Sequence, residues 1–158
     1  MKTKLTKMIM GFLSFACALV CLLAAMTLST HSTAQAAPDG RCDAGQLRGL
    51  YIWTFDGYQN FGGHPVPKAL MIGIQFNGDG TFTIPFSTVN IGGNAFEANG
   101  GVGTYTVAAD CTGTLSDAGG ASFNMYVGPG AQKVWFTQIG GGAGDGSGLG
   151  VGTATRLP

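Results

Sequence analysis

Short runs of alternating hydrophobic and polar residues recur along most of the chain, separated by Gly, Asn and Asp. From residue 37 onward, no stretch of about ten or more residues has the 3.6-residue apolar period and the caps of a helix. A period of two is typical of strands that bury one face, and closely spaced turn residues are typical of all-β sandwiches and barrels. The pattern predicts strands over 50–58, 68–76, 81–88, 94–98, 102–108, 112–116, 121–127, 132–139 and 150–157.

The alternation also predicts which side chains share a face of each strand. In the first run Tyr51, Trp53 and Phe55 fall on one face, and in the third run Phe82 and Phe86 do the same. Aromatic side chains on one face of a small barrel either fill its interior or line a pocket for one small apolar or amphipathic ligand. Both alternatives stay open here. The predicted ligand-lining residues are Tyr51, Trp53, Phe55, Phe82, Phe86, Phe123 and Phe136.

Glycine accounts for 28 of the 158 residues and falls both between and within the predicted strands. Asn77-Gly78-Asp79-Gly80 predicts a hairpin, because tight hairpin turns need positive φ angles. Glycines inside strands, such as Gly103 and Gly152, are costly in a flat sheet but fit tight bends and close backbone approach in a barrel. Closure also removes free edges, which a chain with only 10% charged residues guards poorly. The predicted fold is all-β: a small closed antiparallel up-and-down barrel of eight strands, or nine if every run takes part.

The N-terminus has the three-part pattern of an export signal. Three lysines within the first seven residues precede an apolar run over 8–28, which is followed by Ala34-Gln35-Ala36. This order is typical of a secretory signal peptide. The run is also long enough to span a bilayer as an uncleaved anchor, but the A-x-A site just beyond it favours cleavage. We expect a helical signal peptide over 1–36, a single β-barrel domain over 37–158, and a secreted or periplasmic protein that meets a membrane only through its signal peptide.

The charge balance changes once the signal peptide is set aside. The whole chain is neutral, with eight Lys and Arg and eight Asp and Glu, whereas residues 37–158 keep five basic and eight acidic side chains. A negative charge without basic clusters argues against nucleic acid as a partner, because phosphate backbones are bound by Lys and Arg. A segment of this length is expected to form one modest core rather than two domains.

Two cysteines, Cys42 and Cys111, follow the signal peptide. In an oxidising compartment an even pair predicts one disulfide, which here ties the start of the mature chain to its middle. A metal site is the alternative, but two thiols and His64, the one histidine after residue 36, are too few ligands without help from carboxylates. We therefore expect a Cys42–Cys111 disulfide and no metal.

One longer run resembles a known group of proteins. Gly103-Thr104-Tyr105-Thr106-Val107, followed by Ala109-Asp110-Cys111-Thr112-Gly113-Thr114-Leu115, is similar to the GTYTV-x-x-DCTGTL pattern of small secreted bacterial proteins of unknown function. Leu47-Arg48-Gly49-Leu50-Tyr51 and Gly152-Thr153-Ala154-Thr155-Arg156 resemble the first and last segments of that group. The resemblance implies an eight-stranded barrel of the allene-oxide-cyclase-like or lipocalin-like kind, and no established activity.

A weaker similarity is to lipocalin and avidin-type barrels, in which an Arg from the last strand covers the ring of a G-x-W segment on the first. Gly49, Tyr51 and Arg156 resemble those positions, with Tyr in place of Trp. The similarity implies a cation–π or stacking contact between Tyr51 and Arg156 that closes the barrel.

Few residues offer chemistry. His64 lies in 61–67, which we expect to be a loop over one barrel mouth, and histidine is a residue type often used in acid–base catalysis. Acid–base catalysis needs a partner, and Asp56 and Glu97 are the weak candidates. No G-x-S-x-G segment occurs, and the Gly-rich stretch 140–148 has neither nucleotide-binding nor calcium-binding spacing. We expect no cofactor, and the catalytic residues, if any, are unknown.

These features support three hypotheses about function. The first is a β-barrel that binds a small hydrophobic molecule or associates with itself as a homo-oligomer. The alternative is a cyclase or isomerase that moulds an apolar substrate inside the barrel with few catalytic groups, an analogy at the level of the fold. The third is a structural envelope protein, which low charge and abundant glycine permit. The scarcity of reactive side chains favours binding over catalysis.

Overall fold

The computed structural model describes residues 41–141 and 148–158, and the predicted signal peptide over 1–36 lies outside these described residues. Each predicted run coincides with one strand. The strands are β1 (Arg48–Phe61), β2 (His64–Asn77), β3 (Thr81–Ile91), β4 (Asn94–Glu97), β5 (Gly101–Val107), β6 (Thr112–Asp117), β7 (Ser122–Val127), β8 (Lys133–Gly140) and β9 (Gly148–Arg156). Two short 3-10 turns, η1 (Ala44–Gln46) and η2 (Pro129–Ala131), precede β1 and β8. No helix within the described ranges has the length and hydropathy needed to cross a membrane.

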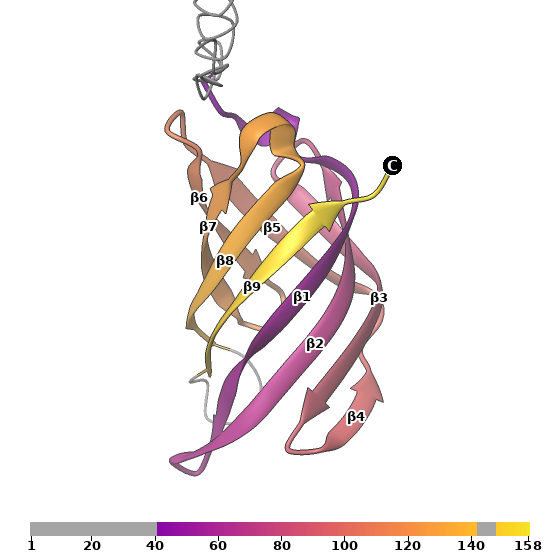
Figure 1. Ribbon diagram of the computed structural model, residues 1–158, viewed down its shortest axis with the longest axis vertical. Coiled ribbons are helices and arrows are strands. Elements are labelled where there is room, and N and C mark those ends of the chain that lie inside the picture. Colours follow the sequence, from indigo (N-terminus) through magenta and orange to yellow (C-terminus); the bar gives the residue numbers. More distant parts are fainter. Residues whose placement is uncertain (1–40, 142–147) are drawn as a thin grey trace, which may run out of the picture. The chain divides into compact units, whose positions relative to one another are not determined.

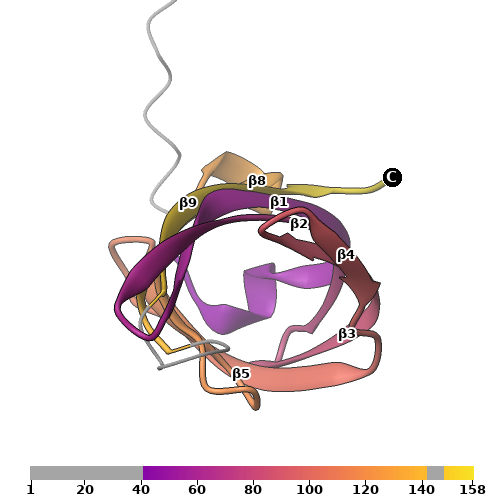
Figure 2. The same ribbon diagram turned by 90° about the horizontal axis from the view of Figure 1, so that it is seen from below.

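Eight of these strands close into an antiparallel barrel, which confirms the predicted fold class. Except for β4 and β5, consecutive strands pair with each other. β3 pairs with β5, and β1 closes the ring by pairing with both β2 and β9. Figure 2 shows this ring end-on. β4 is the additional strand: it pairs with β3 at residues 88–91, whereas β5 pairs with β3 at residues 81–84. β4 and β5 therefore lie along one edge of β3 as two halves of an interrupted strand.

The two ends of the barrel differ (Figure 1). The upper end holds η1, η2 and the C-terminus, and the lower end holds the β1–β2 and β3–β4 hairpins. At the lower end β1 and β2 continue to Phe61 and His64, joined by Gly62 and Gly63, whose φ angles are both positive. The predicted loop over 61–67 is therefore wrong, because a Gly-Gly pair is suited to a tight two-residue hairpin turn.

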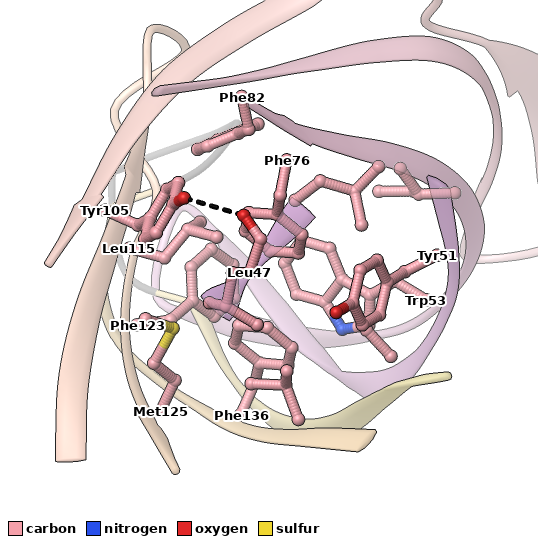
Figure 3. Close-up of a cluster of buried hydrophobic side chains, with 14 of the residues drawn as sticks. Leu47, Tyr51, Trp53, Phe76, Phe82, Tyr105, Leu115, Phe123, Met125 and Phe136 are labelled. Atoms are coloured by element: carbon pink, nitrogen blue, oxygen red, sulfur yellow. Dashed lines mark hydrogen bonds between the residues drawn. The ribbon is translucent and has the colours of Figure 1, made fainter. Parts of the chain in front are cut away.

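Buried hydrophobic side chains pack into a core cluster inside the barrel (Figure 3), and its members Tyr51 and Tyr105 contact η2 and η1 at the upper end. Tyr51 is fully buried, and its hydroxyl donates to the carbonyl of Ala131 in η2 at 2.6 Å. The hydroxyl of Tyr105 lies 2.9 Å from the carbonyl oxygen of Ala44 and 3.0 Å from that of Leu47, between which it shares its proton. Two tyrosines thus tie both short turns to the barrel wall and seal the upper end.

Cys42 and Cys111 form the predicted disulfide at this sealed end, with Cα atoms 5.0 Å apart. Cys42 precedes η1, and Cys111 lies in the turn between β5 and β6. In that turn the side chain of Asp110 accepts hydrogen bonds from the backbone N–H and the hydroxyl of Thr112 at 3.1 and 2.7 Å. The disulfide therefore fastens the start of the described chain to an ordered turn.

Loss of this disulfide is expected to destabilise the barrel. It closes a loop with a sequence separation of 69 residues, which the chain-entropy model values at about 4 kcal/mol. The Cys42→Ser/Cys111→Ser double variant should lose about that much free energy of unfolding in urea titrations under non-reducing conditions. An unchanged free energy of unfolding would contradict this role.

Candidate functional site

A cavity of about 310 Å³ lies in the lower half of the barrel, below the filled core. Residues of β1, β2, β3 and β4 form most of its wall, and the turn between β6 and β7 completes it. Most lining side chains are aliphatic or aromatic, and the polar exceptions are Gln59, Lys68 and Asp117. The interior is therefore filled with side chains at its upper end and hollow at its lower end.

Four of the seven aromatic residues predicted to line a pocket line this cavity, namely Trp53, Phe55, Phe82 and Phe123. Tyr51 and Phe136 belong instead to the buried core, where the Phe136 ring lies 4.7 Å from the Trp53 ring between centroids. The prediction for Phe86 is wrong, because its ring is 38% exposed and covers Gly73.

Phe86 points outward because β3 carries an extra residue at this level. Gly73 of β2 pairs with Phe86 of β3, and Gln75 pairs with Thr83. Between these two pairs β2 has one residue, Ile74, whereas β3 has two, Ile84 and Pro85. A β-bulge of this kind shifts the inward–outward alternation by one position. Ile84 therefore lines the cavity before the bulge, and Val89 lines it afterwards.

The polar side of the cavity is centred on Lys68 near the start of β2. Its side chain is only 9% exposed, and Nζ donates to Oε1 of Gln138 at 2.8 Å and to Oε1 of Gln59 at 3.2 Å. Nζ also lies 5.1 Å from the centroid of the Phe55 ring. The amide of Gln138 is held in place because its Nε2 donates to the carbonyl of Gly141 at 2.8 Å. Its Oε1 therefore faces the lysine.

Glycines give this lysine room to reach across the barrel. Lys68 pairs with Gly57 of β1, and Gly57 pairs in turn with Gly150 of β9. These two positions put no side chain on the inner face between Lys68 on β2 and Gln138 on β8. The Phe55 ring also lies against Gly150, where an added Cβ would come within 2.7 Å of it. Small residues here are thus required by close approach.

Burial controls the electrostatics of Lys68. Desolvation lowers the pKa of the ammonium below 10.5, and the carboxylate of Asp117 opposes that shift. Asp117 lines the same cavity, and its Oδ1 accepts the backbone N–H of Ala121 at 2.9 Å. Amide oxygens and a ring face hold the ammonium directly. A buried cation with a lowered pKa at the wall of a cavity is typical of a functional residue.

The three weak catalytic candidates are not brought together. His64 is exposed beside the β1–β2 turn, and Asp56 is exposed on the outer face of β1. Glu97 is exposed on β4 and accepts a hydrogen bond from Asn99 Nδ2 at 3.2 Å. Over 41–141 and 148–158, no group of three His, Cys, Asp or Glu side chains is placed to hold a metal ion.

The pairing of β1 with β9 places Tyr51 opposite Arg156. The guanidinium lies beside Gly49, where an added Cβ would be 3.7 Å from its Nε. Burial raises the pKa of Tyr51, and the charge of Arg156 opposes that rise. The cation–π contacts found in the described part of the chain are those of Lys68 with Phe55 and of Lys133 with Trp135. Tyr51 and Arg156 are instead joined through the backbone pairing of β1 with β9.

Comparison with family models, with curated proteins and with solved structures finds no match to this chain. The cavity and its lysine are therefore interpreted from their own geometry. That geometry is an apolar chamber with a single buried ammonium near its lower end.

The sequence analysis missed Lys68, Gln59 and Gln138 as site residues, although the alternation contains a signal for them. Lys68 is in phase with Leu70 on the inner face of β2, and Gln59 is in phase with Phe55 on that of β1. A polar residue in phase with an apolar face indicates a buried polar group. Which polar groups meet across the barrel depends on strand order and register, which the alternation does not contain.

The lowered pKa of Lys68 predicts a pH dependence of stability. The folded state releases this proton at lower pH than the unfolded chain, so the unfolded state binds more protons between the two pKa values and stability rises with pH there. The free energy of unfolding of the wild type minus that of Lys68→Met should therefore increase as pH rises toward 10.5. Urea titrations from about pH 7 upward measure this difference.

The matched control is Lys133→Met, which removes an exposed lysine of β8. Its difference from the wild type should show no comparable increase over the same interval. A difference for Lys68→Met that stayed constant or fell with pH would contradict the assigned environment of this lysine.

Proposed function

We propose that this protein binds a small, predominantly apolar molecule inside the lower half of its barrel. The observation that carries the proposal is the cavity of about 310 Å³ beneath a filled core. Eight-stranded barrels have an interior that side chains fill or that holds one small ligand. Ligand cavities have volumes of roughly 300–1,000 Å³, with mostly apolar walls and a few polar groups. Both criteria support binding.

The lower wall supports a route into the cavity. β4 pairs with β3, and its other edge has no strand partner in the described sheet. Phe96 of β4 lines the cavity and is 48% exposed, so it connects the interior with the surface. Ser87 Oγ donates to the carbonyl of Ala98 at 2.7 Å, and the Ser87 N–H donates to Asn99 Oδ1 at 2.7 Å. These bonds fasten the segment between β4 and β5 to β3, so the proposed entrance is the edge of β4 beside Phe96.

Export and kinship with the secreted proteins that carry the DCTGT run are part of the same proposal. The Cys42–Cys111 disulfide supports export, because such bonds persist in oxidising compartments. The exposed positions of His64, Asp56 and Glu97 lend no support to acid–base catalysis in the cavity. Binding is accordingly the function that we propose.

Filling the cavity should weaken binding. The neutral fluorescent molecule N-phenyl-1-naphthylamine is expected to bind the wild type with increased emission, as in an apolar environment. Val89→Trp places a large ring in the cavity from a lining position and should weaken the affinity by about tenfold or more. Fluorescence titration measures both dissociation constants.

Thr88→Trp is the matched control, because Thr88 directly precedes Val89 in β3 and is exposed. It adds the same ring to the outer face and should leave the affinity unchanged. Equal weakening by the two variants, or no binding by the wild type, would contradict binding inside the barrel.

A further inference from the structure

We infer that the occupant of the cavity is a monocarboxylic acid, with its carboxylate on the Lys68 ammonium and its apolar body against the hydrophobic walls. This inference rests on the proposed function and adds the chemical class of the ligand. It depends on the hydrogen-bond geometry of Lys68, on the charges that face the cavity and on the cavity volume.

The ammonium has a donor to spare. An ammonium carries three N–H donors, and Lys68 Nζ directs two of them to the amide oxygens of Gln138 and Gln59. Because Lys68 also lines the cavity, the third donor is available to a molecule inside it. A carboxylate accepts such a charge-assisted hydrogen bond more strongly than a neutral acceptor does.

The surroundings of Lys68 favour an anionic partner. Amide oxygens and the face of the Phe55 ring stabilise the ammonium without neutralising it. A buried charge is costly unless it is paired, so a ligand carboxylate supplies the counter-charge that the cavity wall lacks at this point. A single lysine without an arginine fork suits a monoanion better than a phosphate, which is usually held by several donors.

Asp117 is the other charged group that lines the cavity. Its Oδ1 is engaged by the N–H of Ala121, and it acts on Lys68 through its charge. A ligand carboxylate at Lys68 therefore replaces no hydrogen bond between the two. The charge of Asp117 opposes an anion in the cavity, so Asp117→Asn should strengthen the binding of an acid.

The volume sets the length of the apolar body. A cavity of about 310 Å³ lies at the lower end of the roughly 300–1,000 Å³ that is typical of small-molecule sites. A medium-chain acid such as decanoate matches this size.

Three ligands with the same chain length separate the head group from the chain. Decanoate, decanol and decylamine are compared at pH 7 by displacement of N-phenyl-1-naphthylamine. Decanoate should bind the wild type roughly tenfold to a hundredfold more tightly than decanol, because of one charge-assisted hydrogen bond. Decylamine should bind more weakly than decanol, because its charge has the sign of Lys68.

Lys68→Met should abolish the preference for decanoate while decanol still binds, which also shows that the variant keeps its cavity. Lys133→Met removes an equal charge from the outer face of β8 and should keep the preference. Lys68→Arg, which retains the positive charge, should keep part of it.

The outcomes distinguish the two proposals. If decanol and the fluorescent molecule bind but decanoate shows no preference, or if its preference survives Lys68→Met, the assigned ligand class is wrong and binding in the cavity stands. If none of these molecules binds the wild type, both proposals are wrong. Tightest binding of decylamine would overturn the ligand class as well.

Discussion

The hydrogen-bonded ladder between β1 and β9 closes the sheet, and the interior of the protein depends on that closure. The ladder pairs Trp53 with Ala154 and Phe55 with Gly152, so these two rings of β1 face small residues of β9. The number of strands limits the width of a closed barrel. Within that width, the sizes of the inward side chains decide which levels are filled and which are hollow. Closure also leaves few edges for this weakly charged chain to protect.

Side-chain size divides the interior into two levels. At the upper level the rings of Tyr51 and Tyr105 both pack against Phe76, and the disulfide and both 3-10 turns close the barrel. At the lower level Gly57 and Gly150 occupy inward positions on adjacent strands, and the space extends to the wall opposite. Lys68 is the one ammonium that lines it. In the function that we propose, the apolar walls provide affinity for a hydrophobic body, and the Lys68 ammonium provides selectivity for its head group.

Much of the fold is predictable from sequence because period-two alternation and glycine-rich turns are local signals. They locate every strand and the aromatic interior of β1. Phe86 is mispredicted because the bulge at Pro85 is a feature of the pairing with β2, and the sequence of β3 alone does not indicate it. The cluster around Lys68 is harder still, because Gln59 and Gln138 meet it only after the barrel closes. Composition identifies the scarcity of charge, and the phase of Lys68 with Leu70 indicates that its side chain points inward. Only strand order and register show which polar groups meet it.

The most direct test of the account is to map, by methyl NMR, where an apolar molecule binds. Decanol added to the isotopically labelled protein should shift the methyl signals of Ile72, Ile84 and Val89, which line the cavity. The signals of Leu115 and Val134 in the filled core should shift much less. Shifts confined to methyl groups on the outer face of the barrel, or no shifts at all, would contradict the claim that its lower half is a binding chamber.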